Sequence, residues 1–236
     1  MPSVLITGAN RGLGLEHARQ YLDKGWEVLA CCRSPEKAIE LNALAADNKT
    51  IKIYQLDVTN HSRVEQLATE LAGTKIDVLL NNAGILGADL TQGLQHQTLS
   101  DISYDLWREL LEVNVLAPFK IISAFQDHVA SSDMKVILMM SSGLGSISGN
   151  TIGGLHAYRT SKTSLNMLTK GLAAELEPLG ITIFSMAPGW CKTDMGTELA
   201  EVEVADSVAG QQQVVSEIQF SDSGSWFNYS GELVDW

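Results

Sequence analysis

Short apolar strands alternate with amphipathic helices along the chain, and this alternation constrains the fold more than any other feature. Seven segments have the composition of buried strands: 4–7, 27–32, 51–56, 77–81, 135–140, 181–186 and 226–229. Helical patterns lie between most of them, at 13–24, 36–46, 63–71, 104–129, 157–177 and 204–217. Such strands, joined through right-handed helical crossovers, form parallel sheets. We therefore predict an α/β fold with a doubly wound, seven-stranded parallel sheet and helices on both faces.

The chain has 236 residues, which suits one large α/β domain or two small ones. No internal repeat, low-complexity segment or linker interrupts the pattern, so we predict a single domain over 1–236. The Gly-rich segment 143–154 lies between a predicted strand and a helix. Ligands bind beyond the carboxyl ends of such strands, so this position favours an active-site loop over a domain boundary.

Charge and cysteine content exclude several classes of protein. The net charge of −12 disfavours binding to nucleic acid or to an anionic membrane. No run of about 18 apolar residues predicts a membrane span, and residues 1–3 lead directly into the first strand, which leaves no room for a targeting peptide. The three cysteines, Cys31, Cys32 and Cys191, show no disulfide or metal-ligand spacing. We expect a cytoplasmic protein without a metal.

A glycine-rich turn joins the first strand to the first helix, with the sequence Gly8-Ala9-Asn10-Arg11-Gly12-Leu13-Gly14. Backbone N–H groups and the positive end of a helix dipole meet at such a turn, and together they bind a pyrophosphate. Glycine lets the chain turn sharply and lets a ligand approach the backbone. We predict a dinucleotide site here; the alternative is a tight connection without a ligand.

Tyr158 and Lys162 are four residues apart in a helical pattern, which places the phenol and the ammonium on one helix face. A phenol has a pKa of about 10, so it is a poor acid or base at neutral pH. A neighbouring cation favours the phenolate, and we expect Lys162 to lower the pKa of Tyr158. The pair predicts proton transfer to or from a carbonyl group. The alternative is a packed ring beside a solvated amine.

Other polar residues follow the carboxyl ends of predicted strands. Arg33 follows the second strand, where an acidic residue usually grips the ribose of NAD and an arginine accommodates the phosphate of NADP. With Arg11 nearby, this predicts NADP(H). Asp57 could accept from an adenine amine or could cap the next helix. The segment 81–84, Asn-Asn-Ala-Gly, could let a cofactor pass closely or could be a simple turn.

Two further residues could serve the same chemistry. Asn114 lies in an apolar helical pattern four residues before Pro118, and its carbonyl could be freed there, since proline lacks an N–H. It could hold a water that feeds protons to Lys162, or its amide could be satisfied locally beside a kink. Ser142 ends the fifth strand together with Ser141, and its hydroxyl could donate to a substrate carbonyl oxygen.

Taken in order, these motifs resemble those of the short-chain dehydrogenase/reductases over nearly the whole chain. They are Thr7-Gly8-x-x-x-Gly12-x-Gly14, Asn81-Asn82-Ala83-Gly84, Asn114, Ser142, Tyr158-x-x-x-Lys162 and Pro188-Gly189. The segments 142–147, 153–162, 188–195 and 226–231 are more particularly similar to sniffer-type carbonyl reductases and to bacterial C-factor-like proteins. One departure is the separation of Ser142 and Tyr158, sixteen positions, which is longer than in many members.

The resemblance implies a Rossmann fold and a role for each matching position. Tyr158 would be the general acid or base, Lys162 would lower its pKa and bind the nicotinamide ribose, Ser142 would orient the carbonyl, and Asn114 would support a water relay. The cofactor NADP(H) would be bound by Gly8, Asn10, Arg11, Gly12, Leu13, Gly14, Arg33, Asp57, Val58, Asn81, Ala83, Gly84, Tyr158, Lys162, Pro188, Gly189 and Thr193. Of these, Asp57 would meet the adenine and Thr193 the nicotinamide carboxamide.

The implied reaction is hydride transfer between NADP(H) and a small carbonyl or alcohol substrate. Active-site loops are expected near 85–100, 143–156 and 190–204, and the side chains of Leu144, Ile147, Trp190 and Met195 suggest an apolar pocket for aldehydes, ketones or quinones. The rivals are a non-enzymatic NADP-binding signalling or regulatory protein of the C-factor type and an epimerase or dehydratase. Family members usually pair through the helices at 104–129 and 157–177, which implies a homodimer or homotetramer, although a monomer stays possible.

Overall fold

A sheet of seven parallel strands forms the centre of the computed structural model, which describes residues 1–93 and 95–236. From edge to edge the strands are β3 (Ile51–Gln55), β2 (Glu27–Cys32), β1 (Ser3–Thr7), β4 (Val78–Asn81), β7 (Val136–Met140), β8 (Thr182–Ala187) and β9 (Trp226–Asn228). The chain builds outward from β1 in one direction to β3, then returns and builds from β4 in the other. This topology confirms the predicted doubly wound parallel sheet in a single α/β domain.

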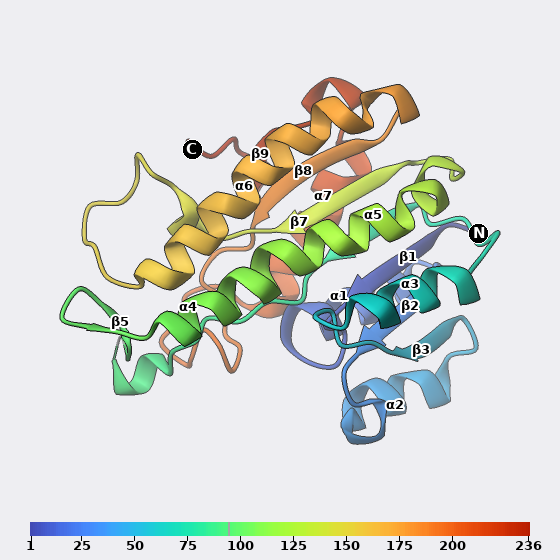
Figure 1. Cartoon of the computed structure of the whole chain (residues 1–236). Coiled ribbons are helices and arrows are strands. Elements are labelled where there is room, and N and C mark those ends of the chain that lie inside the picture. Colours follow the sequence, from blue (N-terminus) through green and yellow to red (C-terminus); the bar gives the residue numbers. More distant parts are fainter. Residues whose placement is uncertain (94) are drawn as a thin grey trace.

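Helices cover both faces of the sheet (Figure 1). An apolar core lies between the sheet and the helices on each face. One face carries α1 (Gly12–Asp23), α2 (Ile39–Asp47) and α7 (Val204–Glu217). The other carries α3 (His61–Glu70), α5 (Ala117–Ala130) and α6 (His156–Leu176). Two neighbouring residues of β2 point to opposite faces of the sheet. Cys31 packs into the core under α3, α5 and α6, and Cys32 packs into the core under α1, α2 and α7.

The helix predicted over 104–129 is divided by a π-helical turn. It consists of α4 (Tyr104–Leu111), the π-turn η3 (Glu112–Leu116) and then α5. The N–H of Ala117 donates to the carbonyl of Glu112, five residues back. Pro118 follows at once and has no N–H with which to continue the α-helical ladder. The wider turn places Asn114 at a buried position facing α6 and the loop after β4.

Several elements of only two or three residues were not predicted from the sequence. Two residues each form the antiparallel pair β5 (Gln97–Thr98) and β6 (Asp101–Ile102), and short 3₁₀ turns occur at Pro35–Lys37, Leu90–Gln92, Gly143–Gly145, Glu177–Leu179 and Phe220–Asp222. The helix predicted from 36 therefore begins at Ile39. Most other predicted ends differ from the observed ones by one or two residues, since local patterns do not determine where pairing stops.

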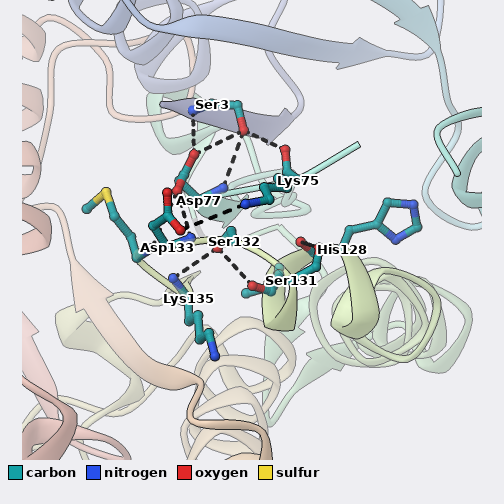
Figure 2. Close-up of polar contacts among 10 residues, drawn as sticks. Ser3, Lys75, Asp77, His128, Ser131, Ser132, Asp133 and Lys135 are labelled. Atoms are coloured by element: carbon teal, nitrogen blue, oxygen red, sulfur yellow. Dashed lines mark hydrogen bonds and ion pairs between the residues drawn. The ribbon is translucent and has the colours of Figure 1, made fainter. Parts of the chain in front are cut away.

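A buried carboxylate ties the amino-terminal edge of the sheet together (Figure 2). Asp77, just before β4, accepts hydrogen bonds from the backbone N–H of Ser3 at 2.9 Å and from those of Asp133 and Met134 at 3.3 and 3.4 Å. The starts of β1, β4 and β7 thus meet at one side chain, at the edge opposite the glycine turn.

None of the described helices combines the length and the apolarity needed to cross a membrane.

Candidate active site

The glycine turn is a close-packed cradle at the start of α1. Gly8 and Gly12 have positive φ angles of 68° and 54°, a region that side chains disfavour. A Cβ atom on Gly14 would overlap the carbonyl oxygen of Gly8 and lie 2.6 Å from the Asn82 amide nitrogen. The start of α1 can therefore pack this closely against Gly8 and Asn82 only because residue 14 has no side chain. Residues 11–14, at the start of α1, line a cavity, and the first N–H groups of a helix have no partner within the helix, as an anion site requires.

The end of β4 is fastened to the glycine turn by hydrogen bonds. The Thr7 hydroxyl accepts from the backbone N–H groups of Asn82 and Ala83, both at 3.0 Å. The Asn82 side chain donates to the carbonyls of Thr7 at 2.8 Å and Gly8 at 3.2 Å. Asn82 also lines the cavity above the turn, whereas the predicted Asn81 is buried and its amide contacts the sulfur of Met139. Successive side chains of an extended chain point in opposite directions, and this alternation at the end of β4 could have distinguished the buried Asn81 from Asn82.

Tyr158 and Lys162 lie one turn apart on α6, and both are buried. The Lys162 ammonium is 5.8 Å from the centre of the Tyr158 ring. It donates to the carbonyl oxygen of Met140, the last residue of β7, at 2.8 Å. The helix period therefore brings the two groups together as predicted, and the bond to β7 holds the amine at the carboxyl edge of the sheet.

Burial changes the pKa of both groups, and for Tyr158 the change is opposite to the one predicted from the sequence. Removal from water raises the pKa of Tyr158, and a hydrogen bond with the Ser142 side chain opposes that rise. Removal from water also lowers the pKa of Lys162, to about 8. The net shift of the Tyr158 pKa is therefore a rise and not the predicted lowering, because desolvation disfavours the charged form of the phenol.

Only one of the three neighbouring serines presents its hydroxyl to Tyr158. The Ser142 oxygen begins the 3₁₀ turn after β7, accepts from the N–H of Leu144 at 3.2 Å and interacts with the Tyr158 side chain. The Ser141 hydroxyl donates instead to the side-chain amide oxygen of Asn166 at 2.6 Å, and the Ser146 hydroxyl donates to the main-chain carbonyl of Asp235 at 2.8 Å. The longer spacing between Ser142 and Tyr158 is taken up by the loop, which leaves Ser142 at the strand end.

Asn114 uses its amide to fasten the loop after β4 to α6. Its side-chain nitrogen donates to the carbonyl of Ile85 at 2.9 Å and to the Ser161 hydroxyl at 3.0 Å, and its oxygen accepts from the N–H of Ile85 at 3.0 Å. Both amide hydrogens are therefore engaged, which agrees with the locally satisfied alternative. A water relay from this residue would have to use its main-chain carbonyl.

Two cavities meet at Tyr158. The smaller, about 160 Å³, lies between the glycine turn, Asn82–Ile85 and Lys162. The larger, about 680 Å³, is mostly apolar and includes Leu144 and Trp190. Residues shared by both walls are Leu13, Ser141, Tyr158, Pro188, Thr193 and Met195. Tyr158 thus stands where a ligand on the glycine turn would meet a ligand in the apolar cavity.

The three loops predicted around the site contribute unequally to the apolar cavity. Leu86 and Leu90 come from the loop 85–100, and Gly143 and Leu155 come from the loop 143–156. The loop 190–204 contributes more residues, among them Cys191 and Gly196, and Gly189 directly precedes it. Leu94, within the first loop, lies outside the described residues. Ile147 is 70% exposed and lines the outer surface instead, because the loop turns its side chain away from the cavity.

The residues predicted to meet the adenosine half of a cofactor lie outside these cavities, at the ends of β2 and β3. Arg33 is exposed directly after β2. Asp57 accepts from the N–H and the hydroxyl of Thr59, at 3.0 and 2.8 Å. Asn60, and not Asp57, caps α3 by accepting from the N–H of Arg63. Val58 is half-buried against the core under α3 and α5.

Arg11 connects the glycine turn to the third loop. Its guanidinium donates to the carboxylate of Asp194 at 2.8 Å, with both side chains largely exposed. Both residues line the smaller cavity. Across residues 1–93 and 95–236, no three His, Cys, Asp or Glu side chains gather closely enough to hold a metal ion.

Comparison with known proteins agrees with this geometry. The profile of the short chain dehydrogenase family matches residues 2–203. C-signal of Myxococcus xanthus is 33% identical over 169 residues, which cover 72% of this chain and 98% of that protein. Among solved structures, the NADPH-bound carbonyl reductase from chicken fatty liver is 32% identical with a TM-score of 0.91, over 100% of this chain and 99% of that one. Carbonyl reductase Sniffer of D. melanogaster is 33% identical with a TM-score of 0.91, over 100% of both chains. The chain belongs to the short-chain dehydrogenase family of oxidoreductases.

Proposed function

We propose that the protein is an NADP(H)-dependent carbonyl reductase, which transfers a hydride between NADP(H) and an aldehyde, ketone or quinone. The observation that carries the proposal is the position of Tyr158, on the wall shared by the glycine-turn cavity and the apolar cavity. A proton donor at that junction faces both a cofactor on the turn and a carbonyl compound beside it. The NADPH-bound carbonyl reductase from chicken fatty liver shares the fold over the full chain, which supports the same cofactor here.

The residues at the turn fit a dinucleotide. A Cβ on Gly14 would overlap the Gly8 carbonyl oxygen, so the turn keeps its tight path only with glycine there. The backbone N–H groups at the start of the following helix are suited to bind a pyrophosphate. Exposed Arg33 after β2 offers a positive charge where the ribose phosphate of NADP(H) would lie. Thr193 lies against Gly12 and lines both cavities, as a contact to the nicotinamide requires. Bound NADPH would supply the hydride.

The chain's own residues would supply orientation and the proton. Burial keeps Tyr158 protonated at neutral pH, so it can donate to the oxygen of a carbonyl group in the apolar cavity. The Ser142 hydroxyl beside it can donate to the same oxygen and stabilise the developing charge. With a pKa of about 8, Lys162 is mostly charged at neutral pH, and its positive charge favours the phenolate that remains after transfer.

Substitution of Tyr158 tests this mechanism. We expect Tyr158→Phe to lower the turnover number for carbonyl reduction by about 10²–10⁴, the usual contribution of a general acid. The dissociation constant for NADPH should change little, since the ring and Lys162 remain. NADPH oxidation over a panel of aldehydes, ketones and quinones measures the first quantity, and fluorescence titration measures the second. Tyr104→Phe, an exposed tyrosine of α4, is the matched control. Near-normal turnover in Tyr158→Phe contradicts the proposal.

Similarity to C-signal raises one rival, a non-enzymatic NADP-binding signalling or regulatory protein. The intact set of Tyr158, Lys162 and Ser142 around a cavity argues against it, because a cofactor sensor needs no proton donor. The same panel separates the two: tight NADPH binding without turnover of any carbonyl compound would favour the rival.

A further inference from the structure

Residues 232–236, here called the return segment, fold back along β9 toward the candidate site. The carbonyl of Glu232 accepts from the N–H of Asn228 at 2.9 Å, and the N–H of Val234 donates to the carbonyl of Trp226 at 2.8 Å. Leu233 forms an antiparallel bridge with Phe227. The return segment is therefore paired to the edge strand of the sheet over three consecutive residues.

Aromatic stacking anchors the tip of the return segment. The ring of Trp236 stacks on the ring of Trp226, with centroids 5.4 Å apart and planes 27° from parallel. Trp226 is only 1% exposed, so it offers a rigid base, whereas Trp236 is 41% exposed. An aromatic pair of this kind adds stabilisation beyond that from the burial of its area.

The anchored tip holds the loop that follows Ser142. The carbonyl oxygen of Trp236 accepts from the backbone N–H groups of Ile147 and Ser148, both at 3.0 Å, and from the Ser148 hydroxyl at 3.1 Å. The Ser146 hydroxyl donates to the carbonyl of Asp235 at 2.8 Å. The main-chain oxygens of Asp235 and Trp236 thus accept hydrogen bonds from three successive loop residues, 146–148, which lie outside any helix or strand.

A short chain of contacts leads from this loop to the reacting groups. The N–H of Ser146 donates to the carbonyl of Gly143 at 3.1 Å, and the N–H of Leu144 donates to the Ser142 hydroxyl at 3.2 Å. Leu144 and Val234, one from the loop and one from the return segment, both line the apolar cavity. The return segment therefore contacts the cavity directly and also fixes the turn on which the Ser142 hydroxyl depends.

We infer that the return segment is a positioning and specificity element of the substrate cavity: by holding the loop 143–148 in place, it sets the apolar wall formed by Leu144 and Val234. This inference rests on the proposed carbonyl reductase activity. Large apolar carbonyl compounds need that wall for binding, whereas a small aldehyde reaches Tyr158 without it. NADPH binding does not involve the wall, because the glycine-turn cavity has neither Leu144 nor Val234 in its lining.

The test is Trp236→Ala, measured with menadione as a bulky quinone and propanal as a small aldehyde. Loss of the stack should raise KM for menadione about two- to tenfold, as expected from the contribution of one aromatic pair. KM for propanal and the dissociation constant for NADPH should stay within about twofold. Hydrogen exchange at the amides of Ile147 and Ser148 should become faster. Trp236→Phe should restore all values, since it keeps a ring on Trp226.

Phe220→Ala is the matched control, because Phe220 is a half-exposed aromatic residue remote from the loop in sequence and contacts. An unchanged menadione KM in Trp236→Ala overturns the inference, and so does an equal rise for both substrates or a parallel loss of NADPH affinity. Absence of turnover by the unsubstituted protein with either substrate is a different result, which would instead overturn the proposed function.

Discussion

Burial acts on Tyr158 and Lys162 in opposite directions, raising the pKa of the phenol and lowering that of the amine. A tyrosine that stays protonated is suited to donate a proton in carbonyl reduction. The residue that assists it most directly here is Ser142, through the hydrogen bond between their side chains. In the reverse reaction, in which the phenolate accepts a proton from an alcohol, the positive charge of Lys162, 5.8 Å from the ring centre, favours the phenolate.

Arg33 determines the cofactor preference in our proposal, and its charge can be reversed without disturbing the core because its side chain is exposed. We expect Arg33→Asp to weaken NADPH binding about 10- to 100-fold, the equivalent of one lost charge-assisted contact. NADH binding should change much less, since NADH lacks the ribose phosphate. Fluorescence titration with both cofactors measures the ratio. Arg108→Asp, which changes an exposed arginine of α4, is the control. Equal losses of affinity for the two cofactors in Arg33→Asp would refute the assignment.

The turn between β1 and α1 depends on the absence of side chains more than on any attractive contact. Gly14→Ala should destabilise the fold or displace the turn, because the new methyl group would overlap the Gly8 carbonyl and crowd the Asn82 amide. Overpacking of this kind costs about 1–3 kcal/mol, and NADPH affinity should fall with it. Thermal unfolding and cofactor titration measure the two effects.

Gly171→Ala provides the matched control within a helix. Nothing lies within 4 Å of a Cβ built at Gly171 in α6. The substitution should therefore stabilise the protein by about 0.5–1 kcal/mol, the ordinary gain of alanine over glycine in a helix. Gly14→Ala with normal stability and normal NADPH affinity would show that the cradle is not required.

The amino-terminal edge of the sheet can be weakened without touching the site. Asp77→Ala leaves the backbone N–H groups of Ser3, Asp133 and Met134 without their shared acceptor (Figure 2). We expect a loss of about 3 kcal/mol in the free energy of unfolding, since buried donors are left unsatisfied. KM and kcat at a temperature well below unfolding should be unchanged. Asp133→Ala, whose carboxylate is almost fully exposed, should cost little; equal losses in both variants would argue against Asp77 as the tie.

At the scale of the whole molecule, a chain of buried polar groups links α1 to the carbonyl of Pro188, a residue that lines both cavities. His17 of α1 meets the Gln211 oxygen at 3.0 Å, the Gln211 nitrogen donates to the Ser207 hydroxyl at 2.9 Å, and Ser207 donates to the Pro188 carbonyl at 2.6 Å. All three side chains are fully buried. Burial is the main cause that lowers the pKa of His17 to about 4; the bond to Gln211 opposes it and the charge of Lys24 adds to it.

This shift predicts an acid-sensitive fold. Between about pH 6.5 and 4 the unfolded chain binds a proton on His17 that the folded chain does not, so stability falls as the pH falls through this range. The lost free energy of unfolding is about 3 kcal/mol by pH 4. His17→Gln should remove that part of the pH dependence, as measured by urea unfolding at pH 7 and pH 4. His96→Gln, on an exposed histidine, should not; the same slope in His17→Gln as in the unsubstituted protein would contradict the prediction.

Local sequence patterns determined the order of the strands and helices, the glycine turn and the pairing of Tyr158 with Lys162. Each follows from periodicity, from backbone conformation or from residues close together in the chain, which act before any distant contact forms. The two periods of the chain were enough to predict the doubly wound sheet, and the spacing of four was enough to place phenol and amine on one face.

Only the tertiary structure decided what surrounds those residues. Burial by distant elements set the direction of the Tyr158 pKa, and contact with Ile85 and Ser161 engaged the Asn114 amide. Hydrogen bonds to Thr7 and Gly8 hold Asn82 in the cavity wall, whereas Asn81 is buried. The return segment meets its loop across nearly ninety positions of sequence. Desolvation and hydrogen bonding depend on every neighbour in space, and no local pattern contains that information.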